Sequence, residues 1–332
     1  MDQKRVGYID SLRGIACLFV LIAHIVSVSE VGSYVSGCGK IGVWLFMVLS
    51  SFLMIYPYEK NRDKQFKILR FYSQKLLRIY PCYLLVLVGA YLSGFITSGR
   101  QLLAHIFIVE GIGHFWYMPV IIKLYIIFPL FILIRKLIKK DSVYLLTIVM
   151  FSALFEFMFP YSRYVENSIS IRWYIPVFGM GICLATVVKR ITEKRRRYWM
   201  ADMGVDVCIG IIFMLTPFMK KIIFDISPSG WLQNKYLLIG FIWCCIIILI
   251  ESGSRSKDIL EKCQLLKKIG KISYPVYLVH YVVLIKLMEY IQQFWILSVL
   301  TVAVSVLIAM VMHHYIEERI QRRKKSYGKL SC

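Results

Sequence analysis

The sequence predicts an all-α membrane protein, a bundle of about ten transmembrane helices. Of its 332 residues, 58% are hydrophobic and only 18% are charged, whereas soluble domains carry about 25% charged residues. The hydrophobic residues gather in runs of roughly 20, the length that one spanning helix needs. These two observations exclude a soluble globular enzyme and a disordered chain.

Ten such runs predict the transmembrane spans, and the links between them are short. We therefore expect one integral-membrane domain over residues 1–332, with no separate soluble domain. A shorter apolar segment, 101–112, is expected to be re-entrant or interfacial. The expected spans cover residues 10–29, 39–58, 77–97, 115–137, 143–160, 171–188, 204–219, 234–251, 273–291 and 295–315.

The charge of the chain is strongly positive, with 41 Lys and Arg against 19 Asp and Glu, a formal charge of +22. On a soluble protein this excess would suggest a nucleic-acid partner. Here the cations gather at both termini and in every second link. Because Lys and Arg collect on the cytoplasmic side of membrane proteins, the pattern predicts that both termini are cytoplasmic. It explains the charge by membrane topology, so we expect no nucleic-acid partner.

The nine cysteines form no CxxC pair, and most lie in apolar runs. Cysteine in such a setting behaves as a small hydrophobic residue. The spacing favours neither a zinc site nor a disulfide framework, so no metal site is expected.

The first span carries three ionisable residues, Asp10, Arg13 and His24. Ionisable groups inside a membrane are costly and usually mark function. At 100° per residue, His24 lies about 20° beyond three full turns from Arg13 and roughly 16 Å further along the axis. Both side chains therefore point the same way, with Asp10 near the same face. Alternatively, His24 is an interhelical hydrogen-bonding residue and Arg13 a positive-inside anchor.

Lys75 and Arg78 share one helix face at the start of the third expected span. Like Arg13, they lie on the predicted cytoplasmic side. Such a pair can hold the phosphates of a nucleotide-like cofactor through charge-assisted hydrogen bonds. The alternative is a plain basic flank of the membrane.

Polar and aromatic residues also mark the fourth and ninth expected spans. His114, Trp116 and Tyr117 open the fourth, where aromatic residues are also normal at a membrane interface. Lys123 follows deeper in that span and needs a partner or a water-filled cavity. His280 lies roughly 10 Å into the ninth span, counted from Ser273. It is either functional or a satisfied interior polar residue.

Four sequence elements resemble the integral-membrane acyltransferase-3 family, and they occur in the order typical of that family. Two lie in the first two spans: Tyr8-Ile-Asp10-Ser-Leu-Arg13 with His24, and Gly42-Val-Trp-Leu-Phe-Met-Val-Leu-Ser50-Ser51. The others are Lys75-x-x-Arg78-x-Tyr-Pro81 and Ser273-Tyr-Pro-Val-Tyr-Leu-Val-His280. Each element alone is weakly specific, but together they cover nearly the whole chain.

Two positions depart from the family pattern. Ser51 stands where the second-span signature normally has Gly, and Ile121 stands where many members have the Glu of a Trp-Ser-Leu-x-x-Glu motif. A role assigned to that Glu is therefore not carried over. We also expect no extracytoplasmic esterase-like domain of the kind that some members append.

The resemblance implies transfer of an acyl group, commonly acetyl, from a cytoplasmic acyl-CoA to a hydroxyl of a carbohydrate. The expected donor is acetyl-CoA, with no tightly bound cofactor. The expected acceptor is a surface polysaccharide or its lipid-linked precursor, and the expected location is the bacterial plasma membrane.

The resemblance also assigns roles to the candidate residues. His24 is the expected general base or a transient acyl carrier, and Asp10 orients Arg13. Arg13, Lys75 and Arg78 are expected to bind the donor phosphates. Trp116, Tyr117 or His280 would hold the oxyanion. The expected substrate-binding residues are His114, Trp116, Tyr117, Ser273, Tyr274 and His280.

A transporter or exporter of a small polar or glycan substrate is the alternative function. Ten spans with His, Lys and Glu inside them also suit a proton-coupled carrier. Carriers often show repeats with corresponding spans interrupted by Gly or Pro. The sequence shows no such correspondence, which favours the acyltransferase.

Overall fold

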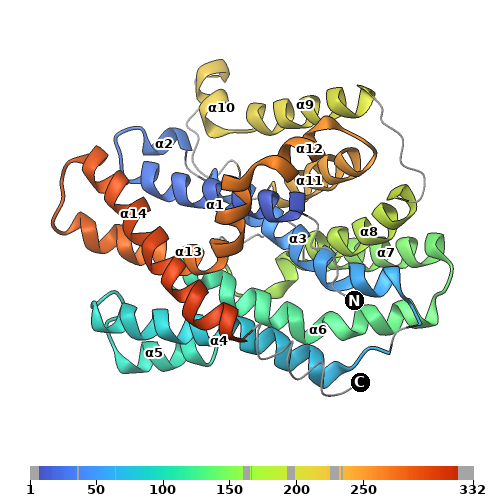
Figure 1. Ribbon diagram of the computed structural model, residues 1–332, viewed down its shortest axis with the longest axis horizontal. Helices are drawn as coiled ribbons and strands as arrows, with labels where there is room; N and C mark the ends of the chain where they lie inside the picture. Colours follow the sequence, from blue (N-terminus) through green and yellow to red (C-terminus); the bar gives the residue numbers. More distant parts are fainter. Residues whose placement is uncertain are drawn as a thin grey trace. The chain divides into compact units, whose positions relative to one another are not determined.

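The computed structural model describes residues 7–35, 37–63, 65–159, 165, 167–192, 199–224, 232 and 235–320, and every regular element in these ranges is a helix (Figure 1). The α-helices are α1 Gly7–Ser27, α2 Gly32–Val35, α3 Gly39–Lys60, α4 Ile68–Leu92, α5 Gly99–Ile106, α6 Tyr117–Leu137, α7 Asp141–Met158, α8 Ile175–Thr192, α9 Trp199–Met214, α10 Pro217–Phe224, α11 Tyr236–Glu251, α12 Arg255–Lys262, α13 Gln264–Met288 and α14 Phe294–Met312. Short 3₁₀ turns η1 Gly113–Trp116 and η3 Ile171–Trp173 precede α6 and α8, and a π-helical turn, η4 His313–Glu318, follows α14.

Among the described residues, seven helical segments are long and apolar enough to cross a membrane, and up to nine if two bent helix pairs each count as one span. The pair α9 and α10 bends by 71° and the pair α11 and α12 by 92°; Figure 1 shows α10 turned away from the axis of α9. The predicted span 171–188 overlaps α8, which is not among these segments. The all-helical membrane architecture is thus confirmed, while the count of ten spans and the cytoplasmic termini stay predictions.

Two helices begin earlier than the apolar runs that predicted them. We expected spans to begin at residues 77 and 273, but α4 begins at Ile68 and α13 at Gln264. The added turns are rich in Gln, Lys, Arg and Leu, which are good helix formers. Hydropathy marks only the apolar part of such a helix, so it misses the polar turns that precede it.

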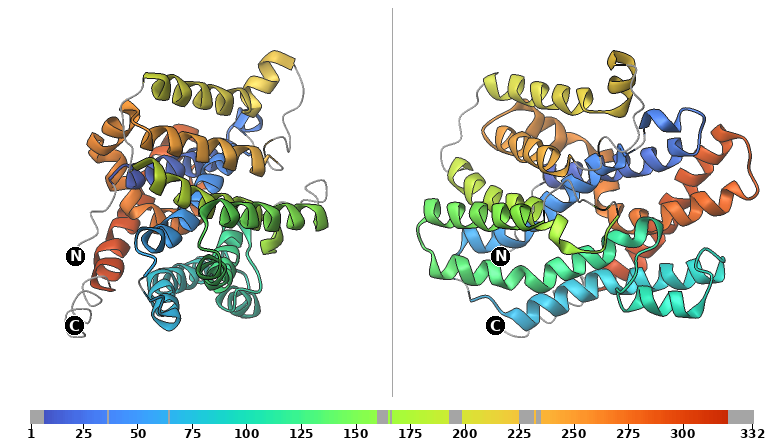
Figure 2. Two further views of the ribbon diagram at one scale, coloured as in Figure 1. Left: turned by 90° about the vertical axis from the view of Figure 1, so that its right-hand side faces the viewer. Right: turned by 180° about the vertical axis from the view of Figure 1, so that it is seen from behind.

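The helices fall into two compact units. The first comprises Met1–Phe66, Leu130–Glu166 and Ser170–Lys271, and the second Lys67–Pro129, Asn167–Ile169 and Ile272–Cys332. Helices α6 and α13 contribute residues to both. In the first unit, α3 packs mainly against α8 and α1, and α7 and α8 lie side by side (Figure 2).

Glycines bring the helices of the first unit into close contact. A Cβ atom on Gly42 of α3 would lie 2.3 Å from the Ala16 carbonyl oxygen of α1. A Cβ atom on Gly270 would lie 1.7 Å from the Asp10 carbonyl oxygen. These distances are far shorter than a real contact, so only glycine permits the two backbones to approach. Small residues at crossings are the usual means of packing membrane helices.

Ser51, one of the two residues that depart from the family pattern, lies at a third close crossing, between α3 and α8. Its hydroxyl donates to the Val48 carbonyl oxygen of its own helix at 3.1 Å. A Cβ atom on Gly181 of α8 would lie 2.0 Å from the Ser51 Oγ. The glycine on α8 therefore provides the space that the larger Ser51 needs.

Candidate active site

Arg13 and His24 lie within one uninterrupted helix, α1, so their spacing puts them on the same face. Val20, on that face, is buried, while Ile22, on the opposite face, is 54% exposed. The Arg13–His24 face is therefore the inward face of α1. His24 itself is half-buried, in the last turn of the helix.

Asp10 lies beside Arg13 at the start of the same face. The Arg13 Nη1 and Asp10 Oδ1 atoms are 3.9 Å apart, and the two side chains are only 12% and 7% exposed. A carboxylate this close favours one orientation of the guanidinium. The geometry is the one expected if Asp10 orients Arg13; the roles of both residues stay predictions.

Two other residues of the opening motif attach α1 to its neighbours. The buried Tyr8 shares a hydrogen bond with Glu251, and its ring lies 5.3 Å from the Lys257 Nζ. The Ser11 hydroxyl donates to the Leu260 carbonyl oxygen at 2.6 Å. Tyr8 and Ser11 thus fix the start of α1 against α11 and α12, and leave Arg13 and His24 on another face.

In the second unit, Lys75 and Arg78 are one turn apart on α4, as expected, but their surroundings differ. Lys75 is half-buried, with its Nζ over the rings of Phe71 at 5.6 Å and Tyr125 at 5.1 Å. Arg78 is exposed. Cation–π contacts restrain the ammonium of Lys75, whereas the guanidinium of Arg78 is accessible to an anion. Phosphate binding by either residue stays a prediction.

Tyr274 connects α13 to α4 next to Arg78. Its hydroxyl donates to the Ile79 carbonyl oxygen at 2.7 Å, and the neighbouring Ser273 is buried. Through this hydrogen bond, Tyr274 helps to position the part of α4 that carries Arg78.

The second unit also brings His114, Tyr277 and His280 together. The His114 and His280 ring centroids are 5.3 Å apart, and both side chains are buried. The Tyr277 hydroxyl donates to the His114 carbonyl oxygen, and the Tyr117 ring lies 5.6 Å from the Tyr277 ring. Trp116 is buried and packs edge-on against Tyr117 at 5.8 Å. Tyr277 thus belongs to this cluster, although we did not select it from the sequence.

The hydrogen bonds of the two histidines define their tautomers. The His114 Nε2 lies 2.8 Å from the Leu278 carbonyl oxygen, and the His280 Nδ1 lies 2.8 Å from the Tyr277 carbonyl oxygen. A carbonyl oxygen only accepts, so each of these nitrogens carries a proton. In a neutral ring, the other nitrogen is then the acceptor: Nδ1 in His114 and Nε2 in His280.

Two local features support this cluster. Gly113 has a φ of +56°, a left-handed conformation that favours glycine, and it starts the turn that carries His114. Lys123, which needed a partner inside the fourth span, donates to the Ile169 carbonyl oxygen at 3.1 Å. Lys123 is thus satisfied by backbone of the same unit.

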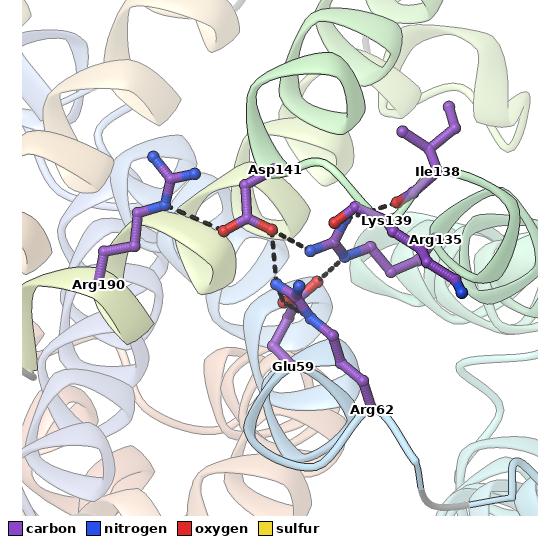
Figure 3. A network of polar contacts seen from close by, with 7 residues as sticks. All are labelled: Glu59, Arg62, Arg135, Ile138, Lys139, Asp141 and Arg190. Carbon is purple, nitrogen blue, oxygen red and sulfur yellow. Dashed lines mark hydrogen bonds and ion pairs between the residues drawn. The ribbon is translucent and has the colours of Figure 1, made fainter.

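An ionic network that the sequence did not reveal connects α3, α6, α7 and α8 in the first unit (Figure 3). The buried Arg135 donates to Glu59 at 2.7 Å and also binds Asp141. Arg62 binds Glu59 at 2.6 Å and Asp141 at 2.7 Å, and Arg190 binds Asp141 at 3.0 Å. From the sequence, we had interpreted these arginines only as cations of the basic links between spans. The acidic residue at the end of a span, Glu59, was the available signal.

Arg62 lies outside the spans and shows the strength of this network. Burial alone would lower the pKa of its guanidinium, but its hydrogen bonds to Glu59 and Asp141 outweigh burial and raise that pKa. Arg62 is therefore charged at any physiological pH. In the described part of the chain, no group of three or more His, Cys, Asp or Glu side chains could hold a metal ion.

Comparison with known proteins identifies the same family that the four sequence elements resemble. A family model described as "Acyltransferase domain", that of the acyltransferase-3 family, matches residues 6–314. The chain is also 22% identical over 295 residues to a protein of Acidianus two-tailed virus named "Putative acetyltransferase ORF330", covering 82% of this chain and 81% of that protein. No solved structure matches the chain. Because the family model covers nearly the whole sequence, the chain belongs to the integral-membrane acyltransferase-3 family.

Proposed function

We propose that the protein transfers an acetyl group from acetyl-CoA to a hydroxyl of a surface polysaccharide or its lipid-linked precursor. Membership of the family supports acyl transfer in a membrane. The name of the viral relative supports acetyl as the group transferred. The observation that carries the proposal is that α1 presents Arg13 and His24 on one inward face.

In this proposal the donor lies along α1. Arg13, oriented by Asp10, binds a phosphate of acetyl-CoA at the cytoplasmic end of the helix. The pantetheine arm then extends toward His24, roughly 16 Å further along the axis. Lys75 and Arg78 are the further residues that we propose for the donor phosphates, through charge-assisted hydrogen bonds.

His24 acts as the general base. Its neutral imidazole takes the proton of the acceptor hydroxyl while the hydroxyl oxygen attacks the thioester carbonyl carbon. The carbon–sulfur bond then breaks, and the thiolate of CoA leaves and takes the proton from the imidazolium. The products are the acetyl ester and CoA. A covalent acetyl-His24 intermediate is the second route to the same products.

A further set of residues binds the acceptor in this account. His114, Trp116, Tyr117, Ser273, Tyr274 and His280 are the residues that we propose for this role. Buried aromatic and imidazole groups suit a carbohydrate because they combine an apolar surface with hydrogen-bonding atoms. Of the three candidates for the oxyanion, we propose Trp116 or Tyr117 as the donor, because Nε2 of a neutral His280 accepts a hydrogen bond and does not donate one. The protein would act in the bacterial plasma membrane, with both termini in the cytoplasm.

A vesicle assay separates this function from transport. Inverted membrane vesicles that contain the protein receive acetyl-CoA labelled in the acetyl group, together with membrane glycolipid as acceptor. The proposal predicts label covalently bound to carbohydrate, with no such label in vesicles without the protein. Movement of carbohydrate across the membrane without label would instead identify a carrier.

A further inference from the structure

A strongly cationic end of the first unit has no part in the proposed reaction. It is formed by residues 59–63, 135–141 and Arg190, which we call the arginine cluster. These residues include the seven cations Lys60, Arg62, Arg135, Lys136, Lys139, Lys140 and Arg190 against the three carboxylates Glu59, Asp63 and Asp141, an excess of four positive charges. The ionic network holds the inner part of this cluster together (Figure 3).

The inner and outer arginines of the cluster differ. Arg135 is buried, and its donors already bind Glu59, Asp141 and the Ile138 carbonyl oxygen. Arg190 is the outermost: its side chain is 56% exposed, and it reaches Asp141 through Nε. A guanidinium has five N–H donors, so Arg190 can bind a second anion while it keeps Asp141. The exposed Lys139 and Lys140 add charge beside it.

The arginine cluster lies at the ends of three candidate membrane spans. Helix α3 ends at Lys60, α6 ends at Leu137 and α7 begins at Asp141. The end of a spanning helix lies at the boundary between hydrocarbon and water, which is the level of the lipid headgroups. The cations are therefore at the depth where phosphate groups of phospholipids occur, on whichever side of the membrane this end faces.

An apolar surface continues from the cluster along α6 and α7. Leu133 and Leu137 of α6 are 53% and 75% exposed, and Val143 and Leu146 of α7 are 45% and 61% exposed. Residues 138–140 separate the two helices, so Leu137 and Val143 are close in sequence to the cations, and Leu133 and Leu146 follow about one turn further along each helix. A soluble phosphate compound has no apolar chains that could cover this surface, whereas the acyl chains of a lipid would cover it.

We propose that the arginine cluster binds an anionic phospholipid, with the headgroup phosphate on Arg190 and Lys140 and the acyl chains along Leu133, Leu137, Val143 and Leu146. Basic sites between the ends of membrane helices bind such headgroups through fixed charge and hydrogen bonds. The bound lipid offsets the excess positive charge and links α6, α7 and α8. This binding does not depend on the acyl-transfer reaction.

The test compares lipids on the purified full-length protein in detergent. Native mass spectrometry gives the dissociation constants for phosphatidylglycerol and for phosphatidylcholine with the same acyl chains. The double variant Arg190→Gln/Lys140→Gln removes two cluster cations at exposed positions. The matched control is Arg255→Gln/Lys262→Gln, which removes two exposed cations from α12 of the same unit.

The proposal predicts that the wild type binds phosphatidylglycerol more tightly than phosphatidylcholine. Each cluster cation removed weakens the binding of phosphatidylglycerol about five-fold, so the double variant loses about 25-fold. The control variant should bind phosphatidylglycerol within about two-fold of the wild type, because the two cations that it lacks lie outside the arginine cluster. Equal affinity for the two lipids, or equal losses in the two double variants, overturns the proposal.

A second measurement distinguishes a lipid from a free phosphate. Thermal stability of the wild type is measured with phosphatidylglycerol and, separately, with inorganic phosphate at the same concentration. We expect a rise in Tm with the lipid and none with phosphate, because only the lipid covers the apolar surface. An equal rise with inorganic phosphate would show that the site binds a soluble phosphate compound and would overturn the lipid assignment.

Discussion

Arg13 and His24 lie on one inward face of α1, about three helical turns apart. The guanidinium is held near Asp10 at one end of the helix, and the imidazole is half-buried at the other. A helix fixes this relation by its period alone, without a loop or a long-range contact. In the proposed reaction, this helix would separate the phosphate-binding group from the general base by a fixed distance.

Removal of the Arg13 charge should weaken the binding of acetyl-CoA. In Arg13→Gln we expect the donor KM to rise about 10- to 100-fold, since a hydrogen bond to a charged group contributes about 1.5–3 kcal/mol. The measurement is a steady-state titration of acetyl-CoA in membranes. Lys268→Gln, at an exposed position of α13 in the same unit, is the control. An unchanged donor KM in Arg13→Gln would remove Arg13 from the phosphate site.

Lys75 and Arg78 should also lower the donor KM, and they should do so through their positive charge. Lys75→Gln and Arg78→Gln should each raise it about ten-fold by the same loss of a charge-assisted bond. Lys75→Arg should retain most of the affinity, because arginine keeps both the charge and the contact with the aromatic rings. The control is Arg70→Gln, an exposed cation two turns earlier on α4. Losses in Arg70→Gln as large as in Arg78→Gln would indicate a plain basic flank.

The close crossing of α1 and α3 should depend on Gly42. Gly42→Ala places a Cβ atom against the Ala16 carbonyl oxygen, so the helices must separate, at a cost of about 1–3 kcal/mol. Gly210→Ala is the matched control, because a Cβ atom there meets nothing within 4 Å and alanine favours a helix. Thermal unfolding in detergent should show a lower Tm for Gly42→Ala only. A Tm for Gly42→Ala equal to that of the wild type would contradict the close contact.

Arg135 and Arg190, two of the three arginines that bind Asp141, should contribute very differently to stability. Arg135→Gln leaves the buried Glu59 with one fewer cation, and loss of a buried partner costs about 3–5 kcal/mol. Arg190→Gln removes an exposed ion pair, which contributes about 0–1 kcal/mol. Thermal unfolding of the two variants, both measured without added anionic lipid, checks this order. Similar losses would mean that the network is not buried as described.

Local sequence patterns predicted the features of this fold that depend on local rules. Runs of apolar residues predicted the helices, because each span must be apolar over its own length. The period of the α-helix predicted the shared face of Arg13 and His24. Hydropathy did not predict the bend between α9 and α10, although Pro217, which cannot donate a backbone hydrogen bond, begins α10.

Contacts between distant parts of the chain could not be predicted in this way. The hydrogen bond from His114 to Leu278 spans 164 residues, and that from Arg135 to Glu59 spans 76. No local pattern specifies either pair, because both depend on how helices pack. Tyr277 was therefore missed as a partner of His114, and Arg135 was interpreted only by its charge.

The most direct test of the central claim is acetyl transfer by His24→Ala. The wild type and the variant are inserted in the same membranes, and equal amounts of inserted protein are confirmed by immunoblot. Loss of a general base lowers the rate about 10²- to 10⁴-fold, so we predict at least a 100-fold fall in kcat with the donor KM little changed. A variant that acetylates carbohydrate at a nearly normal rate would show that the imidazole on α1 is not the base.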